Sequence, residues 1–98
     1  MEAKANPNTK LELLSHFDIT AADVKRYIKM TINEANKKLP TPSPLRVGCA
    51  VMTSKNKSFL GQYIEDPWGS HITAEDFALH KALLDGESEL KMIVVHYC

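Results

Sequence analysis

The chain has 98 residues, of which 44% are hydrophobic and 24% charged, and its twelve basic and twelve acidic side chains balance to a formal net charge of zero. This length predicts one small domain, and the balanced charge disfavours nucleic-acid binding, which needs a basic excess to displace counterions. No run approaches the roughly eighteen apolar residues of a membrane span, and the polar first residues lack the apolar segment of a secretory signal. With two cysteines and no disulfide framework, these features predict an intracellular protein, cytoplasmic or organellar, that is not secreted.

The amino-terminal part of the domain is expected to be helical, after a flexible N-terminus. Residues 1–8 are polar and predict that flexible segment, and a single domain is predicted over residues 9–98. The segment Thr9–Glu12 matches a capping box, in which two side chains three residues apart satisfy each other's free backbone N–H groups at a helix start. A second box, Thr20–Asp23, opens a longer helix predicted over residues 21–38, which the following prolines end.

The remaining sequence predicts three strands and a third helix. Residues 45–53 and 58–63 form a predicted β-hairpin, in which Gly48 and Ala50 are small enough for a helix to pack closely. After a loop, a helix is predicted over residues 74–84 and a buried strand over residues 90–97. Because a helix crosses over before the last strand, that strand is expected to run parallel to one member of the hairpin. The sequence thus predicts an α/β fold with a small mixed three-stranded sheet and helices on its faces.

Four segments then suggest a family. They are Pro42-x-x-Leu45-x-Val47-Gly48, then Gly61-Gln62-Tyr63-Ile64-Glu65, then Thr73-Ala74-Glu75-Asp76-Phe77, and finally residues 84–87 with 92–97. In this order and spacing, they resemble the front half of a cytidine deaminase of the dimeric plant and enterobacterial type. The resemblance covers residues 21–97. It implies a three-layer cytidine deaminase-like half-fold, with residues 9–98 as a single truncated domain of that kind.

The resemblance also implies a role for each matching position. The family's proton-shuttling glutamate is matched by Glu75, and its ribose-contacting asparagine and glutamate by Tyr63 and Glu65. Its first zinc ligand is matched by Thr73, and its two cysteine ligands would fall beyond Cys98. Catalytic zinc needs three nitrogen, sulfur or carboxylate ligands, and a lone carboxylate cannot lower the pKa of water as zinc does. We therefore expect no cofactor here and an inactive Glu75.

Local structure offers simpler explanations for several of these residues. Thr73-x-x-Asp76 is itself a helix-capping pattern, and acidic side chains in a first helical turn are favoured by the helix dipole. His71 is expected to be a polar surface residue, although with His96 and Cys98 it offers donor types for an unplanned metal site. Cys49 is expected in the core. Trp68 suits either stacking on a base or, as we favour, packing on the sheet edge or on a partner.

The last strand determines the functional prediction. In a three-stranded sheet it would leave unpaired N–H and C=O groups at an edge, so we expect another protein chain, either a second copy or a different subunit, to cover it. The expected interface is Met92, Ile93, Val94, Val95 and Tyr97. The favoured function is a non-catalytic cytidine deaminase-like protein, a pseudoenzyme acting through homo- or hetero-oligomeric assembly. Two alternatives stay open: a zinc-dependent cytidine deaminase, as a fragment or completed in trans, and a nucleoside-binding sensor that uses Glu65 and Glu75.

Overall fold

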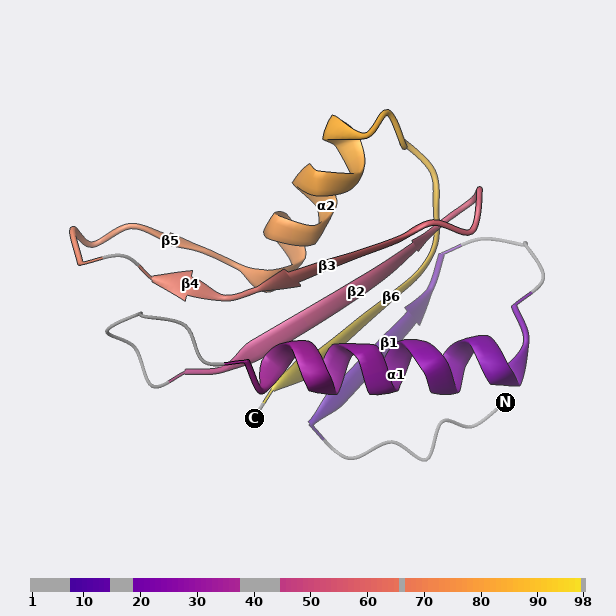
Figure 1. Cartoon of the computed structure of the whole chain (residues 1–98), viewed down its shortest axis with the longest axis horizontal. Coiled ribbons are helices and arrows are strands. Elements are labelled where there is room, and N and C mark those ends of the chain that lie inside the picture. The colour runs from indigo at the N-terminus through magenta and orange to yellow at the C-terminus, as the bar shows by residue number, and fades with distance from the viewer. Residues whose placement is uncertain (1–7, 15–18, 38–44, 66, 98) are drawn as a thin grey trace.

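The computed structural model describes residues 8–14, 19–37, 45–65 and 67–97, and the predicted flexible segment falls, apart from Asn8, outside them. The two helices lie on opposite faces of a sheet (Figure 1). In chain order the elements are β1 (Thr9–Leu13), α1 (Ala21–Ala35), β2 (Val47–Thr53), β3 (Ser58–Gln62), β4 (Ile64–Glu65), β5 (His71–Ile72), α2 (Ala74–Leu84) and β6 (Leu90–Tyr97).

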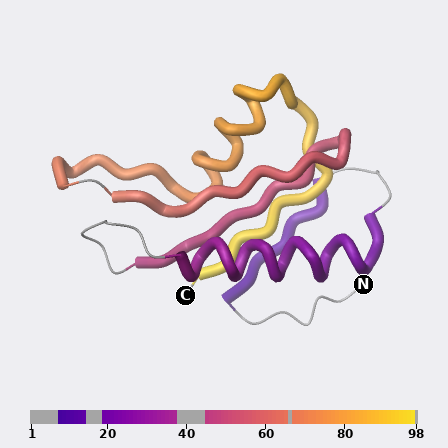
Figure 2. The backbone as a smooth tube through the Cα atoms, viewed as in Figure 1, coloured from indigo at the N-terminus to yellow at the C-terminus, as the bar shows by residue number. Residues whose placement is uncertain are grey.

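The four longer strands form one antiparallel sheet in the order β1-β6-β2-β3, and β4 pairs with β5 in a separate ribbon. Figure 2 shows β6 running between β1 and β2. β6 has the same direction as β3, as a crossover connection requires, but β2 lies between them and every ladder is antiparallel. The prediction of a mixed three-stranded sheet was therefore wrong, whereas the α/β class, the hairpin and the helix before the last strand are confirmed.

Residues 9–13 form a strand, so the helix predicted from the first capping box was wrong. β1 pairs with β6 from Thr9 opposite His96 to Leu13 opposite Met92, and Thr9 Oγ1 lies 2.8 Å from His96 Nδ1. A helix this short is unstable without tertiary support, whereas pairing with β6 satisfies the backbone groups on one side of the segment. β6 is consequently an interior strand, and the unpaired edge predicted for it is wrong.

Alternate residues of the sheet build two separate cores. On one face Ala50, Met52, Met92 and Val94 pack against α1, and on the other Val47, Cys49, Val51 and Val95 pack against α2. Met92 and Val94 are 0% exposed beneath α1. These two residues therefore cannot belong to the predicted interface.

The start of α1 is set by a capping box, and its position on the sheet is set by a close contact with β2. Thr20 and Asp23 form the predicted capping box, with Thr20 Oγ1 accepting from Asp23 N at 3.1 Å. α1 ends at Ala35, three residues earlier than predicted, with Lys38 outside the described residues. A Cβ on Gly48 would lie 2.5 Å from Thr31 O and 2.6 Å from Ala35 N. The close packing predicted for Gly48 is thus confirmed, and it seats α1 on β2.

Candidate functional site

The candidate site begins at the first turn of α2, where Thr73 is the N-cap. Thr73 has an extended backbone, with φ −71° and ψ 157°, and its Oγ1 accepts a hydrogen bond from Asp76 N at 3.1 Å. Glu75 and Asp76 follow in the first turn, where the helix dipole favours negative charge. The capping explanation for Thr73 is confirmed: its hydroxyl satisfies a helix N–H group.

Small residues determine where α2 sits on the sheet. Ala74, Ala78 and Ala82 recur every four residues and form its buried stripe. This stripe lies on Gly61 of β3 so closely that an added Cβ would meet Ala74 O and would lie 2.6 Å from Ala78 N. α2 therefore packs on β3 and β2, and β6 and β1 lie beside it on the same face.

Over β6 and β1, next to α2, the surface forms a cavity of about 440 Å³, which we call the β6 hollow. Strand β6 supplies a half-buried Ile93, a buried Val95 and Tyr97, which is 36% exposed. Lys10 Nζ from β1 lies 5.6 Å from the centre of the Tyr97 ring, a cation–π arrangement. The full lining is Lys10, Leu11, Glu12, Glu75, Ile93, Val95 and Tyr97.

Cys49 lies in the core that α2 covers. It is 0% exposed and its thiol is free, so its predicted place in the core is confirmed. Burial, and after it the nearby Glu75 carboxylate, raise the pKa of the Cys49 thiol to about 12, because both disfavour the thiolate. The thiol is therefore neutral at physiological pH.

The two positions that match the family's ribose contacts bond to each other. Tyr63 OH donates to Glu65 Oε2 at 3.1 Å, and partial burial together with that carboxylate raises the pKa of Tyr63. His71 lies opposite Glu65 in the β4–β5 ribbon, with its ring centre 6.1 Å from that of Tyr63. The structure thus brings Tyr63, Glu65 and His71 together on the ribbon, whereas Glu75 lines the β6 hollow.

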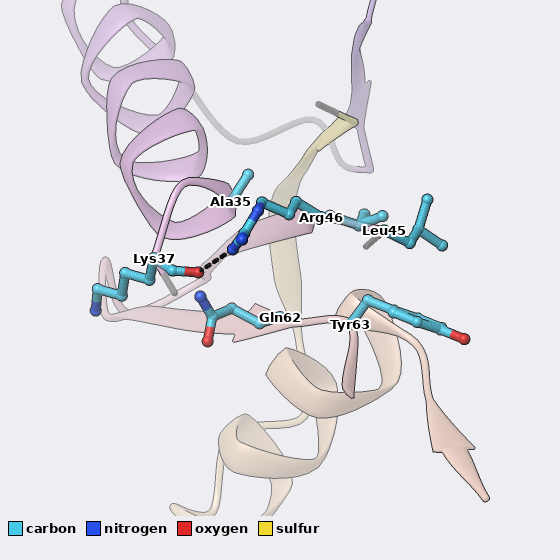
Figure 3. A pocket seen from close by; sticks show the side chains of 7 residues that line it. Ala35, Lys37, Leu45, Arg46, Gln62 and Tyr63 are labelled. Atoms are coloured by element: carbon cyan, nitrogen blue, oxygen red, sulfur yellow. Dashed lines mark hydrogen bonds between the residues drawn. The ribbon is translucent and has the colours of Figure 1, made fainter. Parts of the chain in front are cut away.

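A second pocket lies between the end of α1 and strands β2 and β3 (Figure 3). Arg46 donates to Lys37 O at 3.1 Å, and the Gln62 amide nitrogen donates to Glu34 O. In Figure 3 the ring of Tyr63 points away from the Gln62 amide. The pocket offers only about 10 Å³, roughly the space of one water molecule, so it is no nucleoside site.

The donor groups at the start of α2 do not fit a zinc site. The first ligand position holds the Thr73 hydroxyl, which is engaged as the helix cap, and Glu75 supplies the carboxylate beside it. Within residues 8–14, 19–37, 45–65 and 67–97, no three His, Cys, Asp or Glu side chains form a group that could hold a metal ion. His96 is buried against Thr9, and Cys98 lies outside the described residues.

Sequence reasoning missed three residues of the β6 hollow, all of them on β1: Lys10, Leu11 and Glu12. Lys10 and Glu12 line the hollow; the signal for them was the strict alternation of Thr9, Leu11 and Leu13 with charged residues. Trp68 is 86% exposed, which does not fit packing on the sheet edge, and its packing on a partner stays a prediction.

Comparison of this chain with models of known protein families and with curated proteins finds no match in either case. The likeness to cytidine deaminases therefore rests on the four sequence segments quoted above. No helix in the described part of the chain is both long and apolar enough to cross a membrane.

Proposed function

We propose that this protein is a non-catalytic cytidine deaminase-like protein, a pseudoenzyme that acts through assembly with another protein chain. The observation that carries the proposal is the β6 hollow, which lies beside Glu75 on the part of the sheet that α2 leaves open. Contiguous apolar surface with a polar rim is typical of sites where proteins associate. The part of the family fold retained here would then serve binding.

Two features support the absence of a deaminase reaction. The Thr73 hydroxyl caps α2, and a neutral hydroxyl is a poor substitute for the nitrogen or sulfur ligands that catalytic zinc takes. Without an activated water, Glu75 has no proton to shuttle. In the proposed protein Glu75 keeps a structural task, since its charge lies in the first turn of α2.

The proposed docking surface is narrower than the interface expected from the sequence. It comprises Ile93 and Tyr97 on β6, with the buried Val95 at its base, together with Lys10 and Glu12 on β1. The apolar side chains would be buried by the partner, and the charged ones would form its polar rim, as in most protein interfaces. The partner is either a second copy or a different subunit, in the reducing intracellular setting that a buried free Cys49 suits.

A pair of variants tests the docking surface. Tyr97→Asp places a charge on the floor of the β6 hollow, and Leu84→Asp places the same charge on α2 at an apolar residue that is 89% exposed. We expect Tyr97→Asp to abolish self-association in sedimentation, or capture of a specific chain, while Leu84→Asp leaves the same association intact. Association that both variants retain would contradict the proposal.

Metal analysis and nucleoside assays test the absence of catalysis and the two alternatives. We expect no stoichiometric zinc in purified protein, no conversion of cytidine to uridine, and no heat on titration with either nucleoside. Zinc with turnover would establish the deaminase. Saturable nucleoside binding that is lost in Glu65→Gln, without turnover, would instead favour the sensor. Either result would overturn the proposed function.

A further inference from the structure

The outer edge of β1 offers backbone groups for another strand. Among the strands of the described residues, β1 is the last on its side of the sheet. Tyr97 N donates to Asn8 O and Leu14 N donates to Lys91 O, both at 2.9 Å, so even-numbered residues of β1 direct their backbone groups toward β6. In an antiparallel ladder this direction alternates along the strand. The N–H and C=O groups of Thr9, Leu11 and Leu13 therefore point outward.

The side chains of β1 divide between the two faces of the sheet. Lys10 and Glu12 line the β6 hollow on the face that carries α2. On the opposite face Thr9 bonds to His96, and Leu11 packs against the core beneath α1. Leu13 follows on that same face and is 50% exposed. The edge thus presents a positive and a negative charge on one face and an apolar row on the other.

We propose that a second copy of this chain pairs along β1, antiparallel, with Leu11 opposite Leu11 of the second copy. This inference rests on the proposed function only in naming the partner of the assembly. The outward backbone groups of Leu11 pair across the two-fold axis, and those of Thr9 pair with Leu13 of the second copy. Each such hydrogen-bonded pair exchanges two backbone bonds. Lys10 comes to lie opposite Glu12 of the second copy, and this contact occurs twice.

Charge selects this register over its neighbours. The outward N–H and C=O groups of the two β1 strands meet only when odd-numbered residues of one copy lie opposite odd-numbered residues of the other. A slip that places Thr9 opposite Leu11 also sets Lys10 against Lys10 of the second copy. The opposite slip sets Glu12 against Glu12. Like charges directly opposite each other in a sheet are destabilising, and opposite charges are stabilising, so of these three registers only the one centred on Leu11 sets opposite charges together.

The paired arrangement has two structural consequences. The half-exposed Leu13 gains neighbours from the second copy on the face that carries α1. A two-fold axis perpendicular to the sheet keeps both copies of α2 on one face of a continuous sheet, so the two β6 hollows adjoin each other. Charged residues on an edge strand can equally serve to repel other strands, and the experiment below distinguishes these roles.

Charge reversal in the full chain tests the register. In sedimentation velocity across a concentration series, we expect Lys10→Glu and Glu12→Lys each to weaken the dimer about tenfold, because each sets like charges together twice. The double variant, which exchanges the two charges, should restore the dissociation constant to within about threefold of the original. A chain that stays monomeric at roughly 1 mM, or single reversals without effect, would overturn the proposal.

Disulfide trapping provides an independent measurement. In a Cys98→Ser background, chains carrying Lys10→Cys are mixed with chains carrying Glu12→Cys. Residues in such a non-hydrogen-bonded pair have Cα atoms about 4.5 Å apart, within the range of a disulfide. We expect cross-linked dimers from the mixture and none from either chain alone. Equal cross-linking within each single population would contradict the register centred on Leu11.

The two proposals fail in different ways. If Tyr97→Asp abolishes association and the charge reversals do not, the pairing along β1 is wrong and the docking surface in the β6 hollow stands. If the protein holds zinc and deaminates cytidine, the pseudoenzyme proposal is wrong, while the charge exchange and the cross-link still report on the edge. Circular dichroism of each variant confirms that a loss of association is not a loss of fold.

Discussion

Replacing Thr73 by alanine tests whether this position serves the helix. Thr73 Oγ1 accepts from Asp76 N at 3.1 Å, and loss of such an N-cap typically costs about 1 kcal/mol. With a urea dependence of roughly 1–3 kcal/mol per molar for a small domain, the unfolding midpoint should fall by about 0.3–1 M. Thr20→Ala is the matched control, since Thr20 Oγ1 caps α1 at the same 3.1 Å. Thr73→Ser should keep most of the stability.

Replacing Thr73 by histidine separates capping from metal binding at the same position. Histidine is the residue that the family resemblance implies there, but it should lose the cap and destabilise the protein about as much as alanine does. Zinc should not restore the stability, whereas a site whose Kd lies a hundredfold below the zinc concentration would add about 2.7 kcal/mol. An unchanged urea midpoint in Thr73→Ala would refute the capping argument. A zinc-dependent rise in Thr73→His would refute the conclusion that the groups around the start of α2 do not fit a zinc site.

Three further perturbations probe the packing around the site. Gly61→Ala should lower the free energy of unfolding by roughly 1–3 kcal/mol in a urea titration, because the new Cβ meets the backbone of α2. Gly69→Ala is its control: there a Cβ meets nothing within 4 Å but φ is +95°, so this variant reports the cost of the backbone conformation alone. Burial raises the pKa of Cys49 to about 12, so on raising the pH the unfolded chain loses the thiol proton before the folded chain does. Between pH 9 and pH 12 the free energy of unfolding should therefore fall by about 1.4 kcal/mol per pH unit through this thiol. If the dependence of the free energy of unfolding on pH were unchanged in Cys49→Ala, this prediction would be contradicted. Thr9→Val should cost about 1–3 kcal/mol because His96 Nδ1 loses its partner 2.8 Å away, whereas Thr9→Ser should retain it.

Local sequence signals predicted the elements whose stability is local. The box Thr20–Asp23 placed the start of α1, and the Thr73 cap placed the start of α2, because a cap acts within one helical turn. Residues 9–13 were misassigned because the same Thr-x-x-Glu pattern occurs in a segment whose alternation suits a strand. What decides between the two is β6, about eighty residues away, which no local pattern reveals.

The candidate site depended on that distant contact. Glu75 was found from its place in a motif, but the hollow it lines is completed by Lys10 and Glu12, and these face it only because β1 pairs with β6. Tyr63 and Glu65 were named for a ribose contact, yet the phenol and the carboxylate bond to each other at 3.1 Å. A one-dimensional motif specifies residue types, and the partners that engage them are set by the sheet.

The face of β6 and β1 that α2 leaves uncovered is explained by the positions of two glycines on neighbouring strands. Gly48 on β2 admits α1 near the middle of the sheet, and Gly61 on β3 admits α2 one strand nearer the edge. A helix is roughly 10 Å across and strands lie about 4.8 Å apart, so one helix covers about two strands. α1 therefore packs over β2 and β6, whereas α2 packs over β3 and β2. Because Gly61 lies on β3, α2 leaves the face of β6 and β1 beside it uncovered.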